Sequence, residues 1–206
     1  MFPITKLWVV FTFIVSIAAT PFSLDRRAGS VVVGYRSVSK TQADAYKAAG
    51  STLTWDGSQN SQQLGPGVYI SPVYADWAGA ANDPWYCVIL ADSDAWNLVN
   101  KAWIPGTDGC KELWWGKGAD NRAAYLKDIA GPGATPANTV LLSQIDGFQK
   151  LQLLIPPELL DANGGGLKIK AQCAAASDTA GSDAIKAFGD VNWAGWLNVK
   201  GTVQTV

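Results

Sequence analysis

Residues 30–38, SVVVGYRSV, have the composition of a β-strand. The β-branched residues are continuous rather than alternating with polar ones, which is typical of a strand buried on both faces. Ser39 then offers a favourable helix N-cap, residues 40–49 contain four alanines, and Gly50 offers a favourable C-cap. We therefore predict that the folded part of the chain opens with a strand followed by a helix.

The rest of the chain alternates short strand-like segments with Gly- and Pro-rich turns. Strands are predicted near residues 51–55, 68–72, 85–91, 101–105, 140–144, 149–155 and 167–173. Helices are predicted near 92–100 and 121–130, with a helical turn or two within 73–81. Many short strands with few helices between them favour an α+β fold of mostly antiparallel sheets with a few flanking helices over a doubly wound α/β fold.

The first 27 residues have the features of a targeting segment. Lys6 precedes a 12-residue apolar run that is too short to span a bilayer, and small residues followed by Asp25, Arg26 and Arg27 come after it. We predict a signal peptide plus a short pro-piece over 1–27; the alternative is a membrane anchor. Residues 28–206 are then one secreted globular domain, with a core at about 31–173 and a peripheral tail at 174–206.

Composition excludes several functional classes. Three of the sixteen basic and one of the seventeen acidic residues precede residue 28, so the remaining chain has a net charge of −3. This charge predicts neither nucleic-acid binding nor attachment to an anionic membrane. The chain has no histidine, which excludes Ser-His-Asp catalysis and histidine metal sites, and we expect no metal. Its only glutamates are Glu112 and Glu158.

The cysteine count beyond residue 27 is odd, at three. In an oxidising compartment this predicts one disulfide and one spare thiol, or an intermolecular bond. Cys87 and Cys173 both lie in predicted strands, whereas Cys110 lies in a Gly-rich loop. We favour Cys87–Cys173, with Cys87–Cys110 as the close alternative.

Two motifs carry candidate binding groups. Arg36 on the first strand is either an ion-pair partner or a fixed cation facing a ligand. In residues 65–71, GPGVYIS, the glycines permit close approach of the backbone to a ligand, and Tyr69 and Ser71 alternate onto one face of a strand. The tyrosine ring can stack on a nicotinamide or adenine ring, and the serine hydroxyl can hydrogen-bond one. The structural alternative is an ordinary turn and strand.

Together these motifs resemble the ADP-ribosyltransferase superfamily over roughly residues 31–173. The chain is also similar to secreted fungal proteins of unknown role that share Gly-Tyr-Arg near the start and Ile-Pro-Pro near the end. The resemblance implies a split pair of sheets with NAD bound as substrate by Arg36, Gly67, Tyr69 and Ser71. It also implies a catalytic glutamate on a later strand, and Gln152 occupies that position in this chain.

This departure bears on activity. The family's glutamate stabilises a developing cation at the nicotinamide ribose, and a neutral glutamine can form a hydrogen bond there but supplies no charge. Such an electrostatic contribution is commonly about 10²–10³ in rate. The resemblance therefore implies a secreted toxin or effector whose catalytic residues would be Arg36, Tyr69, Ser71 and Gln152, acting as an NAD-dependent transferase or NAD glycohydrolase if it is active.

The tryptophan content supports a second hypothesis. Ten tryptophans occur in the chain, and most are expected to fill the core. Trp114 and Trp115 are adjacent, so one of them is expected to be exposed or in a cleft if the segment is extended. The alternative function is a non-enzymatic, monomeric binding protein that recognises a protein or glycan through exposed aromatic side chains.

Overall fold

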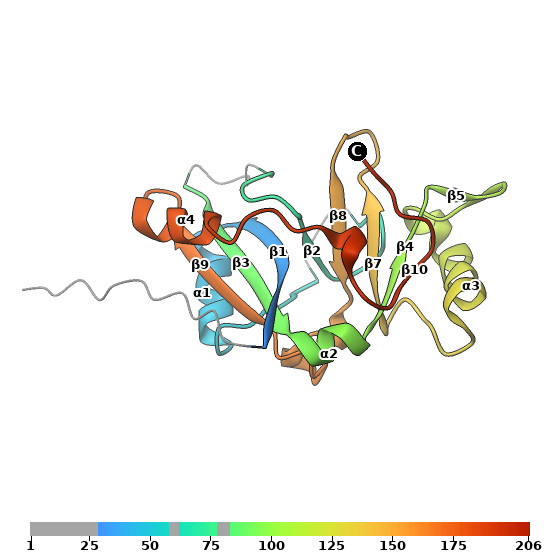
Figure 1. Cartoon of the computed structure of the whole chain (residues 1–206), viewed down its shortest axis with the longest axis horizontal. Coiled ribbons are helices and arrows are strands. Elements are labelled where there is room, and N and C mark those ends of the chain that lie inside the picture. Colours follow the sequence, from blue (N-terminus) through green and yellow to red (C-terminus); the bar gives the residue numbers. More distant parts are fainter. Residues whose placement is uncertain (1–28, 58–61, 78–82) are drawn as a thin grey trace, which may run out of the picture.

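The computed structural model describes residues 29–57, 62–77 and 83–206; the predicted signal peptide and pro-piece lie outside them. The architecture is mixed α+β, as predicted (Figure 1). One sheet is antiparallel, with strand order β1-β3-β9, and consists of β1 (Ser30–Val38), β3 (Trp85–Asp92) and β9 (Lys170–Ala175).

The second sheet has the strand order β10-β4-β7-β8-β2. Its members are β2 (Val68–Ile70), β4 (Asn100–Trp103), β7 (Thr139–Gln144), β8 (Leu151–Ile155) and β10 (Val199–Lys200). The β10–β4 and β4–β7 pairs are parallel, and the β7–β8 and β8–β2 pairs are antiparallel. A small hairpin consists of β5 (Thr107–Asp108) and β6 (Lys111–Glu112).

The helices flank the two sheets (Figure 1). They are α1 (Lys40–Ala48), α2 (Ser93–Leu98), α3 (Ala119–Ala130) and α4 (Thr179–Lys186), with 3₁₀ turns η1 (Gly116–Gly118), η2 (Pro157–Leu159), η3 (Asp161–Asn163) and η4 (Trp193–Gly195). Ser39 caps α1 as predicted, because its Oγ accepts a hydrogen bond from the Gln42 amide at 3.2 Å.

Some elements differ from the sequence-based expectation. Residues 51–55 form no strand, and the described part of 73–81 contains turns but no helix. The segment 174–206 contributes to the centre of the molecule: the Trp193 indole is buried and donates to the carbonyl of Val33 at 2.9 Å. The same segment runs from α4 beside the first sheet to β10 at the edge of the second, so it ties the two sheets together (Figure 1).

The main core lies between the two sheets. Strand alternation places Val33, Ile89 and Ala171 of the first sheet in this core, together with Val140 and Leu153 of the second. The outer face of the first sheet packs on α4, and the outer face of the second packs on α3. Each sheet therefore buries both of its faces, which explains the continuous apolar runs in β3 and β7.

The two sheets meet where β1 passes the end of β2 (Figure 1). Tyr35 and Ser71 form an isolated antiparallel bridge, with N···O distances of 2.8 and 2.9 Å between their backbones. A β-bulge in β1 precedes it, because Val32 pairs with Leu90 and Gly34 pairs with the adjacent Ile89. The bridge is the structural link between the two sheets at this point.

Gly34 makes this close approach possible. Its φ is +152°, and a Cβ atom at this position would lie 2.4 Å from the backbone oxygen of Ser71 and 2.6 Å from Cγ2 of Ile70. Such distances are well inside van der Waals contact, so a side chain would push β1 and β2 apart.

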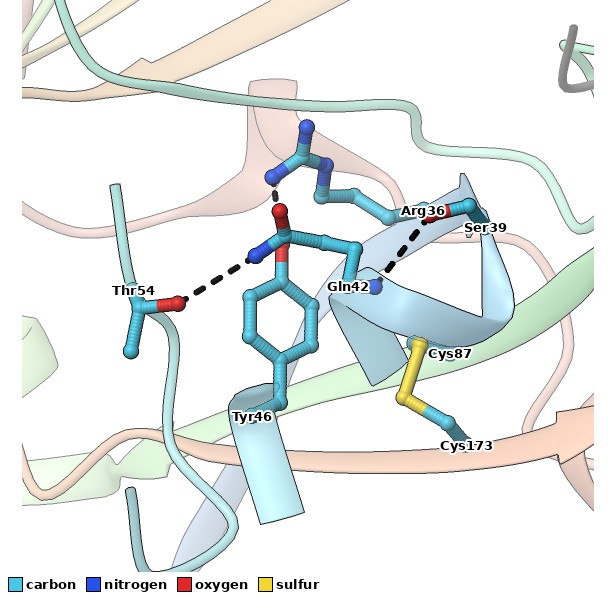
Figure 2. Close-up of a disulfide and its surroundings, with 7 residues drawn as sticks. All are labelled: Arg36, Ser39, Gln42, Tyr46, Thr54, Cys87 and Cys173. Atoms are coloured by element: carbon cyan, nitrogen blue, oxygen red, sulfur yellow. Dashed lines mark hydrogen bonds between the residues drawn. A yellow bond between two sulfur atoms is a disulfide. The ribbon is translucent and has the colours of Figure 1, made fainter. Parts of the chain in front are cut away.

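The disulfide is Cys87–Cys173, the pairing that we favoured, and it joins directly opposed residues of β3 and β9. Cys110 is exposed and free. Arg36 pairs in register with Cys87, so Arg36, Cys87 and Cys173 lie in one row across the sheet on the side where α1 packs (Figure 2). The disulfide therefore cross-links β3 and β9 directly beside the position of Arg36 on β1.

Lys101 of β4 is fully buried. Its ammonium donates to the carbonyl oxygens of Trp96 and Val99, the latter at 2.9 Å, and lies 5.5 Å from the centre of the Trp96 ring. Burial lowers the pKa of Lys101 from 10.5 to about 8. The side chain thus holds the end of α2 against β4 at an electrostatic cost.

We expect Gly34→Ala to lower the free energy of unfolding by about 2–4 kcal/mol, because the new methyl group collides with backbone at the junction of the sheets. Gly133→Ala is the matched control, since nothing lies within 4 Å of a Cβ there and its φ is not positive. Urea unfolding of both variants measures the difference. A Gly34→Ala protein as stable as Gly133→Ala would show that the junction tolerates a side chain.

The pKa of Lys101 predicts a pH dependence of stability. Between pH 8 and 10.5 the unfolded state binds more protons at this group than the folded state, so stability rises with pH there. Relative to that of Lys101→Met, the free energy of unfolding of the wild type should therefore rise by on the order of 1–2 kcal/mol between pH 7 and 9.5. Parallel urea titrations of the two proteins measure this, and subtracting their curves cancels titrations that both share. A flat difference would contradict the assignment.

Candidate functional site

A pocket of about 380 Å³ lies at the junction of the two sheets. Its size is within the range of small-molecule sites. The lining comes from β1, from β2 and the segment that follows it, from the turn between β7 and β8, from β8 and from Trp115. Its members are Tyr35, Arg36, Ser37, Tyr69, Ile70, Ser71, Val73, Ala75, Asp76, Trp77, Trp115, Ile145, Asp146, Phe148 and Gln152.

The structure brings together the four candidate side chains predicted from the sequence. Arg36, Tyr69 and Gln152 come from β1, β2 and β8, and Ser71 directly follows β2. All four line this one pocket. Their roles toward a ligand stay predictions. Gly67 does not line the pocket: a Cβ there would lie 2.3 Å from the Ile155 carbonyl oxygen, so this glycine lets β2 approach β8.

Helix α1 supports the Arg36 side chain through Tyr46. Its Nη1 donates to the hydroxyl of Tyr46 at 2.5 Å (Figure 2). Tyr46 is fully buried, and desolvation raises the pKa of its phenol although the Arg36 charge opposes the rise. The Tyr46 phenol therefore remains neutral, and it fixes the Arg36 guanidinium at the pocket wall through this hydrogen bond.

Tyr69 and Ser71 use their hydroxyl groups within the protein. The Tyr69 hydroxyl donates to the Gly65 carbonyl at 2.8 Å and accepts from the Leu64 amide at 2.9 Å, and burial raises its pKa to about 12. The Ser71 hydroxyl donates to Oδ2 of Asp76 at 2.9 Å. Tyr69 consequently offers a ligand its ring rather than its hydroxyl, and Ser71 shapes the turn that follows β2.

Gln152 is 93% buried, with 7% of its surface exposed. Among the residues that the structure describes, its Nε2 atom has no hydrogen-bond partner. The register that pairs Ile70 with Leu153 carries Ser71 toward Gln152, so the amide lies near the bridge between the sheets. Neither glutamate replaces it: Glu112 and Glu158 are exposed and are not among the residues that line the pocket.

The pocket contains two carboxylates that the sequence analysis did not select as site residues. The first, Asp76, forms an ion pair with Lys150 at 2.9 Å in addition to accepting from Ser71. The Lys150 ammonium also lies 4.7 Å from the centre of the Trp77 ring, a cation–π distance. These contacts fasten the segment after β2 to the turn between β7 and β8.

The second carboxylate, Asp146, belongs to a closed hydrogen-bond network. Its Oδ2 accepts from Nε1 of Trp115 at 2.9 Å, and its backbone amide donates to Oε1 of Gln63 at 2.9 Å. The Trp115 backbone amide donates to the Gln63 carbonyl at 2.7 Å. Gln63 is buried, and its Nε2 donates to the Gln144 carbonyl at 2.8 Å. The network fixes both Asp146 and Trp115 at the pocket wall.

Trp115 also has an unusual backbone, with φ +60° and ψ −175°. Glycine is nearly the only residue that adopts this conformation without strain. For other residues the strain energy is of order 1–3 kcal/mol. The segment around Trp115 therefore keeps the indole in place against its local preference.

Exposed aromatic side chains gather around the pocket. Trp77, Trp115 and Phe148 are 38%, 41% and 51% exposed, and all three line it. The Trp77 and Phe148 rings are in edge-to-face contact at 5.4 Å. Trp114, by contrast, is half-buried and donates to the Ile104 carbonyl at 3.0 Å. The expectation that one member of the Trp114–Trp115 pair is exposed or in a cleft holds for Trp115.

A turn signal in the sequence could have found Asp146. Asp146-Gly147 lies between two predicted strands, which is a strong hairpin signature, and hairpin turns next to a predicted site strand are candidates for its wall. Asp76 and Trp77 have no such signal, because an irregular segment after β2 carries them to the pocket.

Across residues 29–57, 62–77 and 83–206, no three acidic, cysteine or histidine side chains come together as a metal site would require. Within the same ranges, every helix is too short or too polar to traverse a bilayer.

Comparison with known proteins places the chain in a family. None of the curated proteins matches it. A family model described as "Family of unknown function (DUF5910)" matches residues 62–202, which include β2 and all of the pocket lining except the contribution of β1. Because this match covers more than half of the chain, the protein belongs to the DUF5910 family.

Proposed function

We propose that the pocket binds NAD, and that the protein is a secreted relative of the ADP-ribosyltransferases with weakened catalysis. One observation carries the proposal: Arg36, Tyr69, Ser71 and Gln152, which were selected from sequence motifs far apart in the chain, line a single pocket at the junction of two sheets. Residues whose only role is to stabilise their own strand have no reason to share one pocket.

Each group has a role that fits its geometry. Arg36 provides a guanidinium for the diphosphate, and its hydrogen bond to Tyr46 fixes this group at the pocket wall. Tyr69 provides an aromatic surface for the ribose that carries the nicotinamide, since its hydroxyl is already bonded within the protein. Asp76 fixes Ser71 and, through Lys150, the wall opposite β1.

The proposed weakness in catalysis follows from Gln152. Cleavage of the bond between nicotinamide and ribose develops positive charge on the ribose, and a carboxylate beside it lowers the barrier. An amide is isosteric but uncharged, which removes a contribution of about 10²–10³ in rate. Binding of NAD does not require this charge, so affinity is retained where turnover is reduced.

Titration calorimetry with NAD tests the proposal. We expect measurable binding by the wild type and at least a tenfold loss with Arg36→Ala, because the diphosphate loses its cation. Lys127→Ala, an exposed position on α3, is the charge-matched control. Gln152→Glu should raise the rate of nicotinamide release by about 10²-fold. Absence of binding at millimolar NAD, with a folded protein, would refute the proposal.

The exposed aromatic side chains favour a second candidate function, recognition of a glycan or protein. Trp77, Trp115 and Phe148 together present a large exposed apolar surface around a concave site, a pattern found at carbohydrate and protein interfaces. This function needs the aromatic rim but not the Arg36 cation.

A glycan array probed with the wild type, Trp115→Ala and Arg36→Ala separates this candidate from the first. Under the second function, binding falls at least tenfold with Trp115→Ala and is unchanged with Arg36→Ala. If glycan binding falls with both variants, the glycan contacts the Arg36 side of the pocket as well as the aromatic rim, which contradicts the second function as stated. Leu98→Ala, at a residue that is 80% exposed and outside the pocket, controls for loss of a surface apolar side chain.

A further inference from the structure

We infer that Trp115 and Asp146 form a subsite for a planar cationic ring, which selects the oxidised form of the dinucleotide over the reduced form. The identity of the ring rests on the proposed NAD-binding function. The subsite itself rests on the side chains that surround it.

The Asp146 carboxylate has a fixed position. Asp146 is exposed, yet its Oδ2 is bonded to the Trp115 indole at 2.9 Å and its backbone is bonded to the buried Gln63. Oδ1 makes no hydrogen bond to any residue that the structure describes, so it remains available to a ligand. Gln63 thus fixes the backbone of the turn and Trp115 fixes the carboxylate, so Oδ1 has a defined position in the pocket.

The Trp115 indole also has a fixed position and faces the pocket. Trp115 keeps a strained backbone conformation while 41% of its side chain stays exposed in the pocket. Strain at a ligand-facing residue is commonly retained where it orients a functional group. A flat cation stacked on this indole would be attracted by the ring quadrupole and also by the negative charge of the adjacent carboxylate.

The other charged groups near the pocket are already paired or lie on the opposite wall. Lys150 is paired with Asp76 and lies over Trp77, so the second indole at this rim already holds a cation. No cation lies over Trp115 among the described residues. Arg36 comes from β1 in the other sheet, where it is bonded to Tyr46. The pocket therefore offers a cation from one sheet and a free carboxylate oxygen from the other.

This arrangement matches the charges of the oxidised dinucleotide, whose diphosphate is negative and whose nicotinamide ring is positive. The reduced nicotinamide ring is neutral and has nearly the same size. Gln152 adds no negative charge and the Asp76 carboxylate is paired with Lys150, so the discrimination between the two forms falls to Asp146. We expect the oxidised form to bind about five- to tenfold more tightly.

Calorimetry with NAD and NADH tests the inference on the wild type, Asp146→Asn and Trp115→Leu. Asp146→Asn should weaken NAD binding about five- to tenfold and leave NADH binding within twofold, and the difference should shrink at 0.5 M salt. Trp115→Leu should also reduce the preference. Asp128→Asn, exposed on α3 and outside the pocket, is the matched control and should retain it.

A fragment experiment separates the subsite from the dinucleotide. Tryptophan fluorescence quenching by 1-methylnicotinamide, which is cationic, should exceed quenching by neutral nicotinamide, and Asp146→Asn should remove the excess. Selective binding of the cationic fragment without binding of either dinucleotide would support the subsite and refute the proposed function. Equal affinity for NAD and NADH in the wild type would overturn the subsite and leave NAD binding intact. No response to any of the four compounds would overturn both.

Discussion

The backbone bridge between Tyr35 and Ser71 is the constraint on which the pocket depends. It joins the end of β2 to β1, and thereby places residues of two different sheets on one wall. The bridge needs Gly34, because a Cβ there would lie 2.4 Å from the Ser71 oxygen. A bulge at Val33 and a single glycine thus determine that Arg36 and Gln152 share a site although they are more than one hundred residues apart.

Much of the surrounding structure keeps this junction rigid. The Cys87–Cys173 disulfide and α1 support the strand position of Arg36, and Trp193 from the C-terminal segment bonds the Val33 carbonyl beside the bulge. On the other sheet, the side chain and carbonyl of Gln63 connect Trp115 to the turn that carries Asp146. Rigid support of this kind reduces the ordering that a ligand must impose, which favours binding.

The polar groups of the pocket differ in whether they have hydrogen-bond partners within the protein. Ser71, Asp76 and Tyr69 are bonded within the protein, whereas the Gln152 amide nitrogen is buried without a partner. An unsatisfied buried donor is typically unfavourable by about 1–3 kcal/mol. A ligand that accepts a hydrogen bond from the Gln152 amide nitrogen would remove this cost.

The sequence by itself determined the local elements, because capping, β-branching and turn chemistry act over a few residues: β1, α1 and the Asp146-Gly147 turn follow from their own composition. It also favoured the disulfide, since both cysteines lie in strands. Only the tertiary structure decided which loop carboxylates reach the pocket and that both glutamates stay outside it. Those outcomes depend on strand order and on the bridge at Ser71, which are contacts between distant segments that local patterns do not encode.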